Sequence, residues 1–198
     1  MSPALDVNII PTVVNTQHYH VKTHDKRVPV TIGWVGSSST IKYLEIVQAA
    51  IKEILANNPT TRFRIISNEF PSWKWAEKKV WSRESEIEDI LGLDIGIMPL
   101  SDNAWTRGKC GFKIIQCMAS GLPVVVSPVG ANNDIVLDGQ TGFFATSHEQ
   151  WVETLQQLVD SYHLRMQLGQ EGRKRVEESF SVEANAQRYL SILTGAVS

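Results

Sequence analysis

Cysteine is almost absent from this sequence. Cys110 and Cys117 are the only two among 198 residues, and the single helix expected around them would separate them by roughly 10 Å, too far for a disulfide. Two reduced thiols indicate a reducing compartment. Neither a secretory segment at the N-terminus nor an apolar run approaching about 18 residues is present. We therefore expect a cytoplasmic protein without a transmembrane segment.

A surplus of positive charge is lacking too. Nineteen Lys and Arg residues face 21 Asp and Glu residues, which gives a formal net charge of -2. Such a chain is not suited to wrapping nucleic acid or coating an anionic membrane, so neither is expected as a partner. Its length and its 42% hydrophobic content suffice for one globular core and not for two full-sized domains. An anion would have to be held by local geometry, at a small site.

The first 29 residues differ from the rest of the chain. Three prolines and scattered polar residues predict a short lead-in strand over 7–10 followed by a linker. Three histidines fall in this stretch: His18, His20 and His24. Their spacing fits a metal site less well than a solvated loop, because no cysteine or carboxylate pattern accompanies them. We divide the chain into this lead-in, 1–29, and one domain, 30–198, and expect no metal ion.

From Val30 onwards, short apolar runs alternate with amphipathic segments. The runs predict strands at 30–35, 62–66, near 80, at 94–99, 123–127 and 142–145. Helices are expected from 39 or 40 to 57, from 82 to 91 and from 108 to 120, and three more follow, beginning near 147, 162 and 181. Alternating strands and helices imply right-handed crossovers and an α/β fold with a doubly wound parallel sheet and a helical C-terminal end. Ligands bind such sheets at the carboxyl ends of the strands.

The first expected strand is followed by a turn rich in glycine and hydroxyl groups. Gly36 permits close approach, Ser37 and Thr40 offer hydroxyl groups, and Lys42 adds positive charge in the first helical turn. A helix start attracts phosphate through its free N–H groups and its dipole. The pattern is neither a P-loop nor a Gly-x-Gly-x-x-Gly motif. A capped helix with a solvated lysine explains it equally well.

A second turn carries three cations, Arg107, Lys109 and Lys113, around the expected start of the 108–120 helix. Cations at this end of a helix oppose its dipole, so stability gives no reason for them. A bound diphosphate would give one. This turn therefore favours the functional interpretation.

Residues 108–126, GKCGFKIIQCMASGLPVVV, resemble the central motif of the retaining glycosyltransferases of family 4, Glu-Gly-Phe-Gly…Glu-Ala-Met-Ala-x-Gly-x-Pro-Val-Val. Residues 9–15 resemble the entry from the other domain of these enzymes, and 127–143 and 168–181 resemble the segments that follow the motif. The resemblance implies the second, Rossmann-like domain of a GT-B enzyme, which binds a nucleoside-diphosphate sugar. It also implies an acceptor-binding N-terminal domain outside this chain, and a full enzyme that can be peripheral to the membrane.

The resemblance assigns the two turns to the donor. Lys42 matches the lysine of the family's Gly-Arg-x-x-x-x-Lys phosphate clamp, although Ser37 replaces the arginine. The backbone amides of Cys110, Gly111 and Phe112 match those that contact the sugar and the phosphate of the donor. We expect Gly36, Thr40 and Lys113 to complete the donor site.

Both glutamates of the family motif are replaced in this chain. Gly108 stands at the first position, and Arg107 and Lys109 flank it. Gln116 stands at the second position, where its amide oxygen can still accept from ribose hydroxyls. An Arg-Gly-Lys…Lys…Gln variant occurs within the family, so the replacements indicate a subclass.

The expected reaction is glycosyl transfer with retention, which only the family implies. Lys42 and Lys109 would act as catalytic residues by stabilising charge on the leaving diphosphate without a metal or another cofactor. We expect this chain alone to bind the donor and to turn over poorly. A non-catalytic module is the alternative that the missing glutamates favour. A nucleotide-sugar epimerase is a weaker one, because acid and base groups for it are not identifiable. Trp75 or Trp81 can stack on a base, although packing is the commoner role of tryptophan.

Overall fold

A computed structural model describes residues 8–26 and 29–195. It contains one six-stranded sheet in which all neighbouring strands are parallel, in the order β3-β2-β1-β4-β5-β6. The strands are β1 (Thr31–Val35), β2 (Arg62–Ser67), β3 (Glu77–Val80), β4 (Ile95–Met98), β5 (Val124–Val126) and β6 (Gly142–Phe144). The expected doubly wound parallel sheet with a helical C-terminal end is confirmed.

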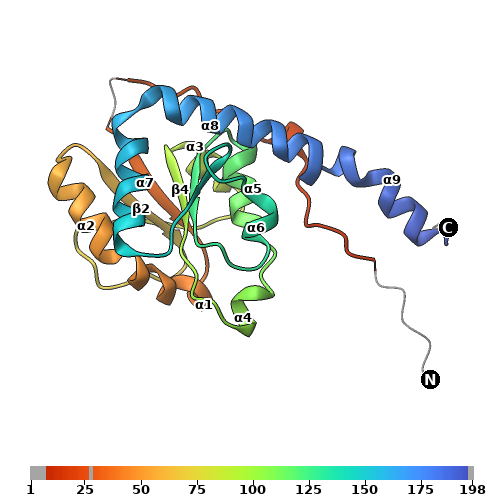
Figure 1. Ribbon diagram of the computed structural model, residues 1–198, viewed down its shortest axis with the longest axis horizontal. Helices are drawn as coiled ribbons and strands as arrows, with labels where there is room; N and C mark the ends of the chain where they lie inside the picture. The colour runs from red at the N-terminus through yellow and green to blue at the C-terminus, as the bar shows by residue number, and fades with distance from the viewer. Residues whose placement is uncertain (1–7, 27–28, 196–198) are drawn as a thin grey trace.

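Both faces of the sheet are buried, as undivided apolar runs require. In β5, Val125 belongs to the core on one face, whereas Val124 and Val126 belong to the core on the other. Successive side chains of a strand point to opposite faces, so a run of valines serves both cores. In Figure 1, α2 and α7 lie on one side of the sheet and α5 and α6 on the other, and α8 runs along one edge of the domain.

The expected helices follow the strands in the expected order, and two short helices, α4 and α6, were not predicted. They are α1 (Ser38–Ile41), α2 (Gln48–Asn57), α3 (Glu86–Leu91), α4 (Ala104–Arg107), α5 (Phe112–Ala119), α6 (Asn132–Ile135), α7 (His148–Asp160), α8 (Tyr162–Arg175) and α9 (Val182–Leu193), with 3-10 turns η1 (Thr16–His18) and η2 (Lys42–Ile46) and a π turn, η3 (Val176–Phe180). Ser147 begins α7 with the predicted capping box, and Ser181 caps α9. Gly121 has the predicted left-handed conformation, with φ 72°.

Two helix predictions need correction. The helix expected from 39 or 40 to 57 is broken into α1, the 3-10 turn η2 and α2. The turn buries two successive side chains in different clusters: Tyr43 packs with Leu100, and Leu44 packs in the main core. The helix expected from 108 begins only at Phe112, because Gly111 before it has a left-handed backbone, and Cys110 is therefore not helical.

The lead-in segment also differs from the prediction. Residues 8–10 form no strand, and residue 7 lies outside the described part of the chain. Val14 instead makes a single bridge with Ser181 at the start of α9. His24 is buried rather than solvated, and its ring lies 3.6 Å from the carboxylate of Asp94. Figure 1 shows α9 and residues 8–13 projecting together from the body of the domain. The boundary at residue 29 stays a prediction.

Candidate functional site

The strand order creates a crevice at the carboxyl ends of β1 and β4. The chain runs outwards from β1 through β2 to β3 and then returns to β4 on the other side of β1. Such a switch point is where open α/β sheets bind ligands. A cavity of about 700 Å³ lies there, within the usual range for ligand sites. Its walls are formed by Trp34, Val35, Gly36, Ser37, Thr40, Asn68, Trp81, Met98, Pro99, Leu100, Ala104, Trp105, Gly108, Lys109, Cys110, Gly111, Phe112 and Lys113.

The turn after β1 forms one wall of the cavity. A Cβ atom at Gly36 would lie 2.2 Å from the ring of Trp34, so packing of that buried ring already requires glycine here. The hydroxyl of Thr40 donates to the carbonyl of Ser37 at 3.0 Å and accepts from its amide at 3.3 Å. This turn is therefore ordered by its own hydroxyl groups, at the mouth of the cavity.

The turn before α5 forms another wall of the same cavity. Gly111 has φ 67°, a conformation that favours glycine, and a Cβ atom there would lie 2.2 Å from Cδ1 of Ile135. Within residues 8–26 and 29–195, the backbone amides of Gly111, Phe112 and Lys113 have no hydrogen-bond acceptor. Free N–H groups at a helix start are suited to an anion. The structure thus brings both predicted turns to one cavity.

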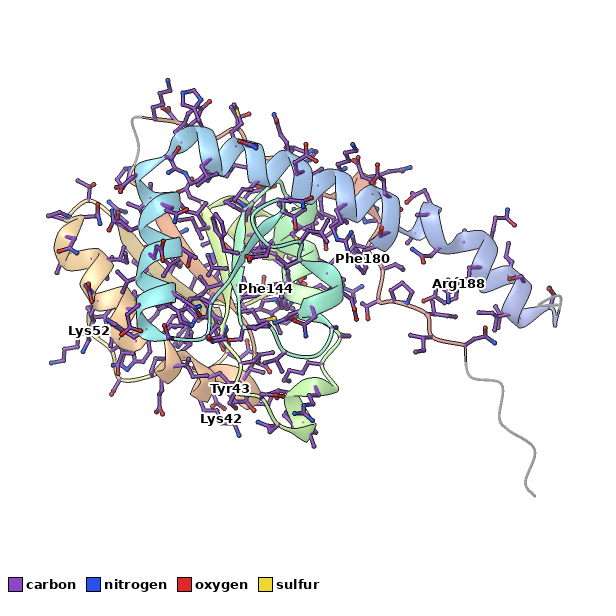
Figure 2. All side chains as sticks on the ribbon, viewed as in Figure 1. Lys42, Tyr43, Lys52, Phe144, Phe180 and Arg188 are labelled. Atoms are coloured by element: carbon purple, nitrogen blue, oxygen red, sulfur yellow. The ribbon has the colours of Figure 1, made fainter. Side chains whose placement is uncertain are left out.

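The lysines and the arginine of the predicted site divide into two groups. Lys109 and Lys113 line the cavity, and the ammonium of Lys109 lies 5.4 Å from the ring centroid of Trp105. Lys42 and Arg107 do not line it. Lys42 is exposed, with its ammonium 5.3 Å from the ring centroid of Tyr43, and Figure 2 shows these two residues at the same edge of the molecule as α1 and α4.

Arg107 is paired away from the cavity. Its Nε and Nη2 donate to the two carboxylate oxygens of Asp102 at 2.6 Å and 3.0 Å. This bidentate pair lowers the pKa of Asp102 and raises that of Arg107, and both side chains are well exposed. Among the described lining residues, the side-chain charges are therefore those of Lys109 and Lys113, with no carboxylate and no histidine.

Gln116 lies in a buried polar cluster that does not line the cavity. Its Nε2 donates to Oε2 of Glu86 at 2.8 Å and lies 2.9 Å from the hydroxyl of Tyr19, whereas its Oε1 is buried without a partner in the described chain. Burial acts to raise the pKa of Glu86, but hydrogen bonds from Lys113, Gln116 and Trp81 outweigh it and lower that pKa. Burial raises the pKa of Tyr19.

No pattern in the sequence indicates that Glu86 belongs to this cluster. The acidic run around it fits the first turns of a helix, where negative charge suits the dipole. Its partners Lys113 and Gln116 follow 27 and 30 residues later, and no short motif joins positions so far apart. Asn68, directly after β2, also lines the cavity and belongs to neither of the two predicted turns.

The fold and the cavity define a Rossmann-like α/β domain with a cationic site at the switch point of its sheet. The sequence model of the glycosyl transferases group 1 family matches residues 29–161, and the chain belongs to this family. The match covers all six strands of the sheet and all the residues that line the cavity. Assignment to family 4 stays a prediction.

Relatives of known name agree with this family. The chain is 25% identical, over 218 aligned positions, to a D-inositol 3-phosphate glycosyltransferase of Corynebacterium efficiens, with 99% of this chain and 50% of that protein covered. It is 32% identical over 83 residues to a probable sucrose-phosphate synthase of Thermosipho melanesiensis, covering 42% of this chain and 19% of that one. The chain thus spans half or less of the length of these relatives.

Solved structures share the fold. The C-terminal domain of the glycosyl transferase group 1 family protein LpcC from Francisella tularensis matches with a TM-score of 0.68 and 20% identity, covering 85% of this chain and 99% of that one. Anabaena Alr3699/HepE, in complex with UDP-glucose, matches with a TM-score of 0.73 and 14% identity, covering 92% of this chain and 56% of that one. In the described part of the present chain, no helix combines the length and the apolar character needed to cross a membrane.

Proposed function

We propose that this chain is the donor-binding domain of a retaining glycosyltransferase and that it binds a nucleoside-diphosphate sugar. One observation carries the proposal: the turns around Ser37 and Gly111 line a single cavity at the switch point of the sheet. Free amides and Lys109 give that cavity a positive potential suited to a diphosphate. The UDP-glucose complex of Anabaena Alr3699/HepE supports the assignment through the shared fold.

The proposed chemistry uses fixed positive charge. The bond between C1 of the sugar and the diphosphate oxygen breaks, and its electron pair stays on the leaving diphosphate. An acceptor hydroxyl forms the new bond to C1 and gives its proton to the leaving diphosphate. Lys109 and the amides around Gly111 would stabilise the charge that develops on the diphosphate, and Lys42 would join them by turning its exposed side chain towards the cavity. Neither a metal nor another cofactor enters the proposal.

The proposed partner is an acceptor-binding domain. The chain spans about half of the D-inositol 3-phosphate glycosyltransferase that it matches, and the other half would supply the acceptor site and the second wall of the cleft. We therefore expect this chain alone to bind the donor and to turn over poorly. Its two free cysteines fit a cytoplasmic enzyme, and a peripheral place at the membrane is proposed for the full enzyme only.

Titration calorimetry with uridine and guanosine diphosphates and their sugars tests the donor site. Lys109→Ala should weaken diphosphate binding about tenfold, the order expected for losing one charge-assisted contact. Lys42→Ala should weaken it by a smaller factor. Lys174→Ala, an exposed lysine on α8, is the matched control and should leave the affinity unchanged. No binding by the wild type, or equal affinities for the wild type and Lys109→Ala, would contradict the proposal.

A non-catalytic nucleotide-sugar-binding module is the second candidate. It is favoured by Gly108, which leaves the described cavity walls without a carboxylate, and by Gln116, which replaces the second glutamate of the family motif in the buried cluster. It predicts donor binding without product when the chain is joined to its acceptor half. An epimerase is disfavoured by the same walls, because they offer neither a carboxylate nor a histidine for proton transfer. Product analysis with the joined protein separates transfer from binding alone, and the anomeric configuration of the product tests retention.

A further inference from the structure

The carboxylate of Glu86, the first residue of α3, accepts hydrogen bonds from three side chains. Its Oε1 accepts a hydrogen bond from Nε1 of Trp81 at 2.7 Å and is in close contact with the ammonium of Lys113. Its Oε2 accepts from Gln116 at 2.8 Å. Only 14% of the Glu86 side chain is exposed. Trp81 and Lys113 line the cavity, whereas Glu86 is not among the lining residues.

The position of each of these two lining side chains depends on that carboxylate. The indole N–H of Trp81 can only donate, and Glu86 is its acceptor. Lys113 has a long flexible side chain, and Glu86 is the only carboxylate paired with it in the described ion pairs. The Lys113 ammonium consequently lies 5.8 Å from the ring centroid of Trp81 and 5.4 Å from that of Phe112.

The ion pair between Glu86 and Lys113 makes the charge of the cavity lining uneven. Glu86 neutralises Lys113, whereas none of the ion pairs in the described chain involves Lys109. Among the lining side chains, the positive charge without an ion-pair partner is therefore that of Lys109, whereas Trp81 and Phe112 lie beside the neutralised Lys113. A diphosphate is suited to Lys109 and the free amides around Gly111, and a flat uncharged group is suited to the ring of Trp81. In a nucleoside diphosphate, that flat group is the base.

We propose that Glu86 is a positioning residue that fixes Trp81 as the wall against which the base of the nucleotide packs, and that holds the charge of Lys113 away from the diphosphate. This inference rests on the proposed function and names the residue that gives the site its preference for a nucleotide over a bare diphosphate. The carboxylate that the family motif has at position 116 is thus supplied from another helix, 2.8 Å from the amide that replaces it.

The test compares two ligands in one calorimetric experiment. The probes are inorganic pyrophosphate and either uridine or guanosine diphosphate, whichever binds the wild type more tightly. Glu86→Gln removes the charge at constant size. Nucleotide affinity should fall about tenfold, as expected when a base loses an ordered aromatic contact. Pyrophosphate affinity should stay equal or rise, because Lys113 loses its counter-ion. Glu88→Gln, an exposed glutamate on the same helix, is the matched control and should preserve both affinities.

A second variant separates position from charge. Glu86→Asp keeps the charge but shortens the side chain, so it should also lower the ratio of nucleotide to pyrophosphate affinity. In NMR spectra, the indole N–H signal that disappears in Trp81→Phe identifies Trp81, and it should shift in both Glu86 variants. Thermal melts establish whether each variant is folded. If Glu86→Gln is not folded, the affinity ratio measured for Glu86→Asp decides the test.

The possible outcomes are distinct. An unchanged affinity ratio in a folded Glu86 variant overturns the inference. Equal weakening of both ligands also overturns it, because that pattern belongs to a merely structural role. If the wild type binds pyrophosphate and nucleotide equally, the base makes no contact and the inference fails while a diphosphate site stands. If the wild type binds neither, the proposed function fails and the inference fails with it.

Discussion

Replacing Asp94 by asparagine tests how strongly the contacts of its carboxylate with residues 22–24 and with β1 stabilise the domain. Oδ1 of Asp94 lies 3.1 Å from the ammonium of Lys22 and 3.6 Å from the ring of His24, and Oδ2 accepts from the amide of Thr31 at 2.8 Å. The carboxylate is buried just before β4. It therefore ties residues 22–24 to two central strands.

The pKa of Asp94 gives the size of the effect. Burial acts to raise it, but His24, Lys22 and the Thr31 amide together lower it from 3.8 to about 2. A difference of this size corresponds to about 2 kcal/mol of folding free energy. Because the folded pKa lies below the unfolded one, this contribution is complete above the unfolded pKa and is lost as the pH falls from about 4 to about 2.

Urea unfolding followed by tryptophan fluorescence measures the effect. At pH 7 we expect Asp94→Asn to lower the free energy of unfolding by about 2 kcal/mol and the melting temperature by roughly 4 to 8 °C. The difference from the wild type should shrink below about pH 4. Asp134→Asn, at an exposed aspartate, is the control. A loss under about 0.5 kcal/mol at pH 7, or an unaltered pH dependence in the variant, would refute the reasoning.

Two further predictions concern the cavity walls. Gly111→Ala should lower the free energy of unfolding by about 1 to 2 kcal/mol because of its left-handed backbone, and by more because the new Cβ atom would clash with Ile135; it should also weaken nucleotide binding. Gly139, with φ 69° and nothing within 4 Å of an added Cβ atom, is the control, because Gly139→Ala carries the backbone cost alone. Equal losses of stability in the two variants would contradict the packing of Gly111 against Ile135. With a thiol reagent, exposed Cys110 should react in the native protein and be protected by bound nucleotide. Burial raises the pKa of Cys117 to about 12, so that thiol should react only after unfolding, and native reaction of both thiols would argue against the structure.

The sheet and its order of elements were predictable from local pattern. Undivided apolar runs such as 94–99 and 123–127 can be buried only between two layers of helices, and the structure places β4 and β5 there. The glycine and proline after 119 predicted where α5 ends, and Gly121 has the conformation that such an end needs. These strands and this helix end depend on residues that are close together in the chain, so they can be predicted from the sequence alone.

The remaining features depend on contacts between distant residues. The break between α1 and α2 follows from the separate partners of Tyr43 and Leu44, which no helical period shows. Gly36 was expected to admit a ligand, whereas the ring of Trp34 already occupies the space beside it. The neutralisation of Lys113 by Glu86 joins two helices across 27 residues. The sequence pattern therefore located the two turns, and only the fold showed which of their charged side chains line the cavity.

Amide NMR spectra recorded during titration with uridine diphosphate test the central claim most directly. If the diphosphate is held between the two turns, the amide signals of 37–40 and 110–113 should shift together and saturate with one affinity, while signals of α9 stay in place. Shifts confined to one turn, or shifts centred on the separate cavity between Ile10 and Arg188, would contradict it.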